Sequence, residues 1–390
     1  MSTFYPMTSS TWGDEEVEAI KKVVSSDRFT AGEQVARFEH EFARYHKRKY
    51  GVMVNSGSSA NLIAIAAFCN HRSRKLNRGD EVIVPTLAWS TTYSPFQQYG
   101  LELRFVDIDI DNLGIDTGQL EAALTSKTRA ITGVSILGNP CALDTLRAFA
   151  NNHNLWFFED NCESLDAELD GEKTGSFGDI STFSFFFSHH ISTIEGGMLL
   201  MDDMELFHLA KALRAHGWTR DLPRSSPIFE EKDDDFFEQY RFIIPGYNVR
   251  PTEINAAIGL EQLKKLPTMT NIRRKNLNLF ESMFKEDPRF HIQTQNGIGS
   301  SFSFPIILSD QFKRQTVLAN LSEAKIEHRI ITGGNILRND VMKYYNHTIV
   351  GGGAPNTDRA HYQGFFVGNY PADLTIQVEK LYEILDKACR

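Results

Sequence analysis

The sequence predicts an α/β fold, with a large domain that holds a mostly parallel sheet between helices and a smaller α+β domain after it. Two observations predict this. Through the first two thirds of the 390 residues, apolar runs of strand length alternate with helical patterns, and each run ends in a polar loop. After Pro267 the alternation stops. Strands alternating with helices form parallel sheets covered on both faces, which bind ligands at the carboxyl ends of their strands.

The individual elements follow from apolar periodicity and from turn residues. The early part opens with an acid-capped amphipathic helix and then repeats units of strand, loop and helix. A charged, proline-containing surface excursion and two long helices follow, and short strands and loops end the chain. In order, these are a helix at 10–26, strand–turn–helix units at 49–68 and 80–100, apolar strands within 103–109, 128–138 and 155–169, the excursion at 221–240, and helices at 252–266 and 270–286. The predicted domains are 1–267 and 268–390.

The composition argues against several kinds of partner. A net charge of −9 disfavours nucleic acid, whose phosphates require clustered Lys and Arg, but leaves a small anionic substrate open. No apolar run approaches the ~18 residues of a membrane span. Residues 1–16 lack the basic and apolar regions of a signal peptide, so we expect a cytoplasmic protein without a membrane partner. The cysteines, Cys69, Cys141, Cys162 and Cys389, are scattered, which predicts free thiols and no metal site.

Residues 55–65, NSGSSANLIAI, predict a strand that delivers Gly57 and Ser58 to the first turn of a helix. Free backbone N–H groups and the helix dipole bind an anion such as phosphate at this place. The alternative is an ordinary helix cap by Ser58 or Ser59.

Polar and aromatic side chains follow two other predicted strands. Asp160 and Glu163 come after an apolar strand, where an acid can hold a proton on a heterocyclic nitrogen of a cofactor. Helix capping is the alternative for these acids. Trp89 also follows a strand, where an indole packs in a core or stacks on a planar ligand.

The run TFSFFFSHHISTIEGG, residues 182–197, predicts a buried strand, a tight loop and a second strand. Ser184 and Ser188 offer hydroxyl donors, and His189 and His190 follow them. A single histidine is more often structural than catalytic, but two adjacent ones in a loop strengthen a catalytic interpretation.

The order and spacing of these motifs resemble the fold-type I pyridoxal-phosphate enzymes. Within them the chain resembles the sugar-nucleotide aminotransferases of the DegT/DnrJ/EryC1/StrS family, and residues 246–266, GYNVRPTEINAAIGLEQLKKL, are nearly diagnostic. The resemblance extends from about residue 10 to 385. The family's cofactor-binding lysine lies six residues before the Glu of Glu-Gly-Gly, and that position here is His189.

A histidine at this position is typical of a subset of the family, the coenzyme B6-dependent 3-dehydratases of nucleotide-linked 4-keto-6-deoxy sugars. The resemblance therefore implies that the protein removes the C3 hydroxyl of such a sugar, most closely a GDP-linked one. It implies pyridoxal or pyridoxamine phosphate bound without a covalent link, L-glutamate as amino donor, and His189 as acid and base. The nearest lysines, Lys173 and Lys211, lie outside the loop.

The resemblance also implies roles for matching residues. Gly57, Ser58 and Ser184 would hold the phosphate, Trp89 would stack on the ring, Asp160 would pair with the ring nitrogen and Glu163 would lie beside it. Asn248 would reach the cofactor phosphate of a neighbouring subunit, which implies a homodimer with shared sites. The substrate candidates are Ser188, His216, Arg220, Arg250, Glu327 and Arg329. Arginine suits a diphosphate, although Arg220 and Arg329 could also be solvated surface charges.

Other interpretations stay open. A dehydratase of a heptose or a CDP-linked sugar would share most of these motifs. Among these, a CDP-sugar dehydrase with an iron–sulfur cluster also replaces the lysine by histidine, but the scattered cysteines argue against it. A non-catalytic relative that acts as a binding protein could also lose the lysine, but this would not explain why Trp89, Asp160 and Ser184 remain.

Overall fold

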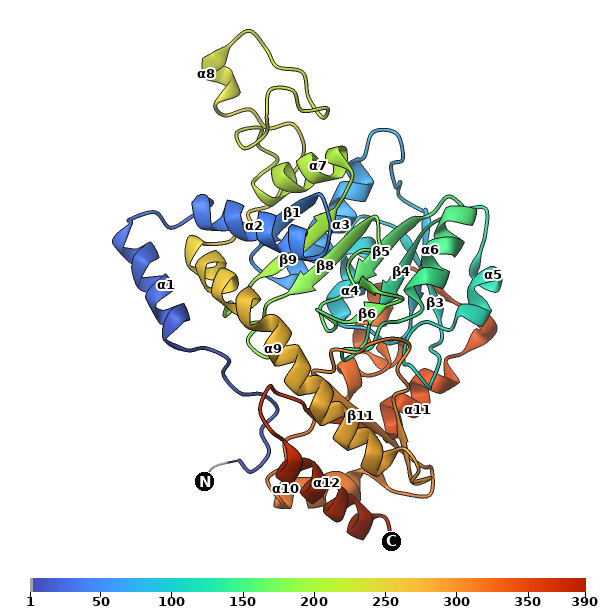
Figure 1. The fold of residues 1–390 in the computed structure, drawn as a ribbon. Coiled ribbons are helices and arrows are strands. Elements are labelled where there is room, and N and C mark those ends of the chain that lie inside the picture. Colours follow the sequence, from blue (N-terminus) through green and yellow to red (C-terminus); the bar gives the residue numbers. More distant parts are fainter. Residues whose placement is uncertain (1–2) are drawn as a thin grey trace.

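In the computed structural model, which describes residues 3–390, a central sheet of eight strands forms the large domain (Figure 1). One strand, β9 (Gly197–Met201), pairs antiparallel with the strand on each side of it, and all other neighbouring pairs are parallel. In spatial order the strands are β1 (Tyr50–Val54), β9 (Gly197–Met201), β8 (Ile180–Ser184), β5 (Trp156–Asp160), β4 (Thr128–Val134), β2 (Glu81–Pro85), β3 (Glu102–Val106) and β12 (His347–Ile349). The predicted α/β fold with a mostly parallel sheet is confirmed.

Helices cover both faces of this sheet, because successive side chains of its strands point to opposite faces and are buried on both. Val82 and Val84 pack with one set of helices, and Ile83 between them packs with the other. One face is covered by α3 (Gly57–Asn70), α4 (Ser90–Gln98) and α7 (Met204–Arg214). The other is covered by α5 (Leu120–Ala123), α6 (Leu143–Asn152), α2 (Glu33–Tyr45) and the first half of α9 (Glu253–Phe284).

The smaller unit packs a three-stranded antiparallel sheet against helices. Its strands are β10 (Phe290–Ile292), β11 (Ser303–Leu308) and β13 (Gly364–Gly368), with β11 in the middle. Its helices are α10 (Arg314–Glu323), α11 (Pro355–Gln363) and α12 (Thr375–Ala388). The remaining elements are α1 (Asp14–Ser25), α8 (Asp235–Glu238), the hairpin β6 (Glu168–Leu169) and β7 (Glu172–Lys173), and 3₁₀ turns at Thr117–Gln119, Ile331–Gly333, Ile336–Arg338, Asp340–Tyr344 and Val350–Gly352.

One helix joins the two units where the sequence predicts two helices. The helix α9 runs without a break through Pro267 and extends from beside α2 to α10 and α12 (Figure 1). Its first half is buried against the large domain through Leu260, and its second half enters the small core through Phe280. Burial at both ends holds the helix together although proline removes one backbone hydrogen bond.

The division at residue 267 stays a prediction, and two segments cross it. Tyr5 belongs to the core of the small unit, and β12 adds a strand to the large sheet beside β3. The charged excursion at 221–240 carries α8 and projects away from the sheet (Figure 1).

Candidate active site

A cavity of about 690 Å³ opens at the carboxyl ends of the parallel strands, where ligands bind in such sheets. Its wall combines loops after β1, β2, β5 and β8 with small-domain residues such as Phe302 and Phe366. Nine of the residues that the sequence predicts for a site line it: Gly57, Ser58, Trp89, Asp160, Glu163, Ser184, Ser188, His189 and Arg329. Loops from separate strands thus meet in one place.

The start of α3 forms an anion cradle. The helix cap is Ser56, whose hydroxyl accepts the backbone N–H of Ser59 at 3.1 Å, so the capping alternative for Ser58 and Ser59 is wrong. The first helical N–H groups, of Gly57 and Ser58, have no acceptor within the helix. A side chain at Gly57 would meet the Cβ of Ser184 at 2.6 Å, so only glycine lets the two loops approach this closely. The Ser58 hydroxyl lies 2.8 Å from that of Thr91.

Asp160 is held by donors on three sides. Its Oδ2 accepts hydrogen bonds from the Asn61 side chain at 2.9 Å and from the Thr92 hydroxyl at 2.8 Å. Its Oδ1 accepts the backbone N–H of Cys162 at 3.1 Å, so the carboxylate also ties down the loop that follows β5. The Asn61 oxygen in turn accepts from Thr182 on β8 at 2.7 Å. A carboxylate fixed in this way presents one orientation to a donor in the pocket.

Trp89 lies on the wall of the pocket at the start of α4, and its side chain is 58% exposed. Core packing therefore does not account for this indole. Its face is available to stack on a planar ring.

His189 is the histidine that lines the pocket. Its Nδ1 lies 2.5 Å from the carbonyl oxygen of Cys162, so the neutral ring carries its proton on Nδ1 and leaves Nε2 free to accept one. Its ring stacks on Phe302, with centroids 5.6 Å apart and planes 19° apart. Burial lowers the pKa of His189, which the Cys162 carbonyl and Asp160 partly oppose. The imidazole is therefore a neutral base near pH 7.

His190 is fully buried and does not line the pocket. Among the described residues, neither of its ring nitrogens has a hydrogen-bond partner of good geometry, although the backbone of Ser300 lies close. Burial holds its pKa well below the usual histidine value. Of the two adjacent histidines, only His189 reaches the site.

Glu163 links the two units across the pocket. Its Oε2 accepts the backbone N–H of Leu137 and the hydroxyl of Thr332, both at 3.1 Å. Burial raises the pKa of Glu163 to about 7. Thr332 has a φ of +42°, a left-handed conformation that is unfavourable for a β-branched residue.

Four residues important to the pocket escape the sequence patterns: Asn61, Thr92, Phe302 and Thr332. Asn61 and Thr92 each lie within the first five residues of a helix that follows a strand, so their position at the carboxyl edge of the sheet is a signal that could identify them. Phe302 and Thr332 come from the small unit, and no local pattern points to them.

The remaining predicted residues do not line this pocket: Asn248, His216, Arg220, Arg250 and Glu327. Arg250 donates to the Asn248 side chain at 3.0 Å, and the Arg220 guanidinium lies 5.0 Å from the centre of the Trp218 ring. Glu327 accepts the backbone N–H of Met7, which itself lines the pocket. Their roles in a site stay predictions.

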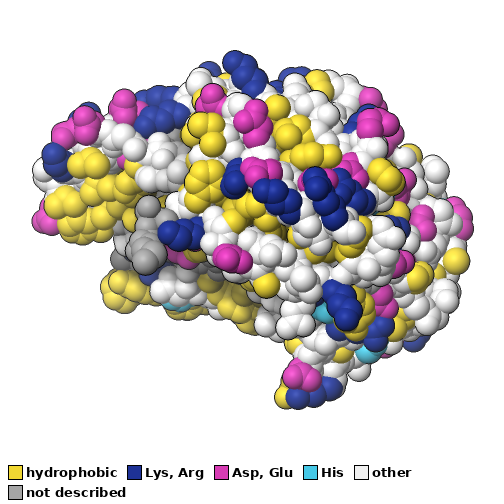
Figure 2. All heavy atoms as spheres, turned by 90° about the horizontal axis from the view of Figure 1, so that it is seen from below, with side chains coloured by type: hydrophobic (Ala, Val, Ile, Leu, Met, Phe, Trp, Pro, Cys, Tyr) yellow, Lys and Arg dark blue, Asp and Glu magenta, His cyan; other side chains and the backbone are white. Residues whose placement is uncertain are grey.

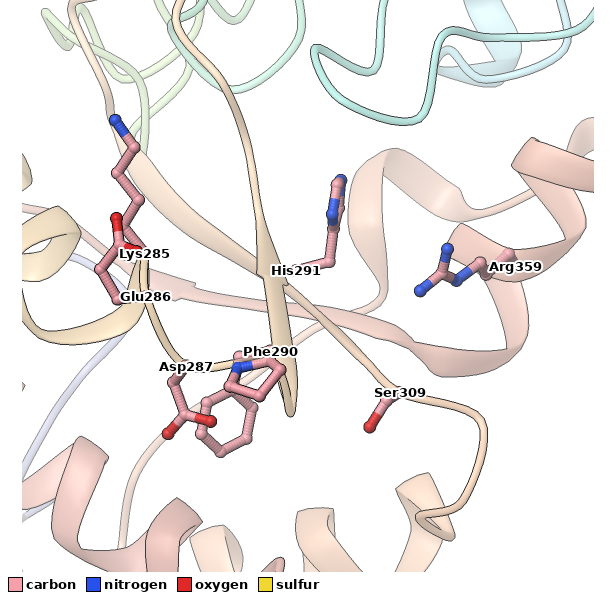
Figure 3. Close-up of a pocket in the computed structure, with 8 residues that line it drawn as sticks. Lys285, Glu286, Asp287, Phe290, His291, Ser309 and Arg359 are labelled. Carbon is pink, nitrogen blue, oxygen red and sulfur yellow. The ribbon is translucent and has the colours of Figure 1, made fainter.

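A second pocket, of about 360 Å³, lies in the small unit (Figure 3). Its side chains come from the end of α9, from β10 and from α11, and include Lys285, His291 and Arg359. Its Asp287 is already paired with Arg289 at 2.6 Å. None of the predicted site residues lies here.

Within residues 3–390, no three His, Cys, Asp or Glu side chains are grouped as they would be around a metal ion. No helix in the same range combines the length and the apolar character needed to cross a membrane.

The comparisons with known proteins agree with this geometry. The model of the DegT/DnrJ/EryC1/StrS aminotransferase family matches residues 10–386, so the chain belongs to that family. The chain is 47% identical over 387 residues to GDP-4-keto-6-deoxy-D-mannose 3-dehydratase of Yersinia pseudotuberculosis, with 98% of each chain covered.

Two solved structures extend the likeness to three dimensions. The E. coli GDP-4-keto-6-deoxy-D-mannose-3-dehydratase with bound hydrated PLP superposes with a TM-score of 0.96 at 44% identity and covers 99% of this chain and 100% of its own. A GDP-4-keto-6-deoxymannose-3-dehydratase with a trapped PLP–glutamate geminal diamine gives 0.95 at 44% identity, over 98% and 100% of the two chains. The resemblance and the fold type that the sequence predicts are confirmed.

Proposed function

We propose that this protein removes the C3 hydroxyl of a nucleotide-linked 4-keto-6-deoxy sugar, GDP-4-keto-6-deoxy-D-mannose, and yields the 4-keto-3,6-dideoxy sugar. One observation carries the proposal: His189, a neutral base, stands in the pocket at the position where the family's aminotransferases have lysine. Of the described residues that line the pocket, none is a lysine. The 47% identity to a 3-dehydratase of this substrate supports the choice of sugar.

The pocket residues fit pyridoxal or pyridoxamine 5′-phosphate. The N–H groups at the start of α3, with the hydroxyls of Ser58 and Ser184, suit a phosphate, and Gly57 leaves room for it beside Ser184. The exposed face of Trp89 suits stacking on the ring, and Asp160 suits the protonated ring nitrogen. Histidine forms no stable covalent link with an aldehyde, so these contacts would bind the cofactor without a tether.

The chemistry divides between cofactor and protein. When bound, the cofactor supplies an electron-withdrawing pyridine ring that makes its C4′ carbon acidic. Asp160 keeps the ring nitrogen protonated. His189 takes a proton at C4′ through Nε2 and gives one to the departing C3 hydroxyl, which leaves as water. L-Glutamate would supply the amino group and, by its oxidation to 2-oxoglutarate, the two electrons that the loss of the C3 oxygen requires, in line with the solved relative that holds PLP and glutamate. The amino nitrogen would finally leave as ammonia. Arg329, on the pocket wall, and Ser188 would contact the substrate.

We also propose a homodimer with shared sites. The residues Asn248, His216, Arg220 and Arg250 would then act in the pocket of the neighbouring subunit. The projecting excursion and the residues after it expose large aromatic side chains, among them Phe236 at 83% and Tyr240 at 67%. Val17 and Val24 of α1 are also exposed, and Figure 2 shows hydrophobic side chains gathered on a lobe at the left of that view. Exposed apolar side chains gathered in this way are typical of an interface.

Unpaired thiols in the described chain support a cytoplasmic location.

The test is incubation of the purified protein with pyridoxal phosphate, L-glutamate and GDP-4-keto-6-deoxy-D-mannose, followed by mass spectrometry of the sugar nucleotide. We expect loss of the C3 oxygen and release of ammonia. GDP-mannose, which has no 4-keto group, is the control and should stay unchanged. A 4-amino sugar as main product would make the protein an aminotransferase. Binding without turnover would make it a binding protein, and turnover only with an added reductase would favour the iron–sulfur class.

A further inference from the structure

The ring of His189 packs against a segment of the small unit. A buried network of hydrogen bonds holds this segment in place. Phe302, which stacks on His189, directly precedes β11. Its carbonyl accepts the backbone N–H of Asn369 at 3.0 Å. The Asn369 side chain donates to the carbonyl of Ser301 at 2.7 Å and holds that residue at a φ of +31°. Asn369 is 1% exposed, so this support is internal.

Arg273 of α9 completes the network and carries a charge without a partner. It is 2% exposed, and its Nε donates to the carbonyl oxygen of Asn369 at 3.0 Å. Asn369 donates in return to the Arg273 carbonyl at 3.0 Å. Within residues 3–390, the Nη1 of Arg273 has no hydrogen-bond partner, and no carboxylate offsets the burial that lowers the pKa of the guanidinium to about 9, so it is still charged near pH 7.

The next residue on the helix provides a contrast. Arg274 lies 3.7 Å from the carboxylate of Glu168 and donates to the Asp166 carbonyl at 3.0 Å. A buried charge without a counter-ion destabilises a fold, and such charges are ordinarily paired. The protein therefore pairs one arginine of α9 and leaves its neighbour, the one that bonds to the support of Phe302, unpaired.

We propose that Arg273 is a positioning residue for His189: with Asn369 it fixes the segment that places Phe302 on the imidazole, and it brings an unpaired positive charge into the buried network that supports this contact. This rests on the proposed function, in which His189 must begin as a proton acceptor.

The charged and titratable groups around His189 have opposing effects. On the pocket side lie Asp160, Glu163, Glu195 and Arg329, and the carbonyl of Cys162 binds Nδ1. On the inner side lie His190 and Arg273. Burial lowers the pKa of His189 most, the Cys162 carbonyl and Asp160 raise it, and Arg273 lowers it further by the smallest of these effects. Because a positive neighbour disfavours the imidazolium, removal of the guanidinium should raise the pH at which His189 takes up a proton.

The experiment is an NMR titration of histidine ring carbons in the holoenzyme, with the His189 signal assigned by its loss in His189→Asn. In Arg273→Met we expect the His189 midpoint to rise by about 0.5 to 1 pH unit, and the acid limb of kcat/KM to move by the same amount. Arg273→Lys should restore both. The matched control is Arg274→Met, which removes a charge already balanced by Glu168 and should leave the midpoint in place.

An unchanged midpoint in folded Arg273→Met would overturn the proposal, as would an equal shift in Arg274→Met. If Arg273→Met fails to fold, Arg273→Gln keeps a donor for Asn369 without the charge and gives the same measurement. Failure of both neutral variants to fold, with Arg273→Lys folded, would overturn the proposal by making the arginine a structural support alone. The NMR titration needs no sugar substrate, so its outcome is independent of whether the proposed reaction is correct.

Discussion

The loops that follow the strands differ from the segment 216–250 in one respect. The residues of the loops form a pocket within one chain, and those of the segment do not. Residues directly after β1, β2, β5 and β8 meet in one pocket. The residues predicted for substrate or phosphate on the 216–250 segment stay outside it. Parallel strands deliver their carboxyl ends to a common edge whatever the length of the connections, so a residue after a strand has a defined place. A surface excursion has no such constraint, and a second subunit can decide where it acts.

The largest effect should come from His189→Asn, because the loops that form the pocket bring only this histidine into it as a base. We expect dehydration to fall by at least about 10³-fold, while the cofactor stays bound through the phosphate cradle, Trp89 and Asp160. Turnover by mass spectrometry and cofactor content after gel filtration measure the two. His190→Gln is the matched change at the neighbouring, buried histidine. If that variant loses the reaction and His189→Asn keeps it, the base is misassigned.

The same difference separates the features that the sequence could predict from those that it could not. The fold and the residues at the strand ends could be predicted, because apolar runs, glycine and terminal polar residues carry local signals. Thr332 could not, because its left-handed backbone and its hydrogen bond to Glu163 depend on how the small unit packs. Phe302 is one of many phenylalanines, and only the tertiary fold brings it to His189. The continuity of α9 through Pro267 also depends on packing at both ends of the helix.

The second effect concerns two adjacent acids of β5. Asp160→Asn should lower turnover by about 10- to 100-fold, because a charge-assisted hydrogen bond to the ring nitrogen is lost. Its neighbour Glu159 is fully buried and accepts the backbone N–H groups of Gly175, Phe177 and Gly178.

The control Glu159→Gln should therefore lower the unfolding temperature without a matching loss of turnover per folded molecule. Calorimetry and activity per bound cofactor separate the two variants. Equal loss of specific activity in both would mean that Asp160 acts only by holding the loop.

The third effect tests whether the 216–250 segment acts across subunits. Asn248→Asp would place a carboxylate against the cofactor phosphate, so we expect each of Asn248→Asp and His189→Asn to be inactive alone. Mixed by unfolding and refolding in equal amounts, they should recover about a quarter of the original activity, because half of the dimers are mixed and each holds one intact site. No recovery, with mixed dimers demonstrated by mass spectrometry, would place Asn248 in the pocket of its own chain.

The smallest effect lies in the pocket itself, at Glu163, where burial raises the pKa from 4.5 to about 7. The folded protein then binds this proton more tightly than the unfolded chain does. Its contribution to stability is therefore complete below about pH 4.5 and is lost as the pH rises through about 7. Glu163→Gln should remove this loss, so between pH 5 and pH 8 its free energy of unfolding should fall less than that of the unaltered protein, by about 2 kcal/mol. Urea unfolding of the cofactor-free protein at the two pH values measures the difference. Equal pH dependence in both proteins would show that Glu163 is ionised in the fold, and that its hydrogen bonds from Leu137 and Thr332 outweigh its burial.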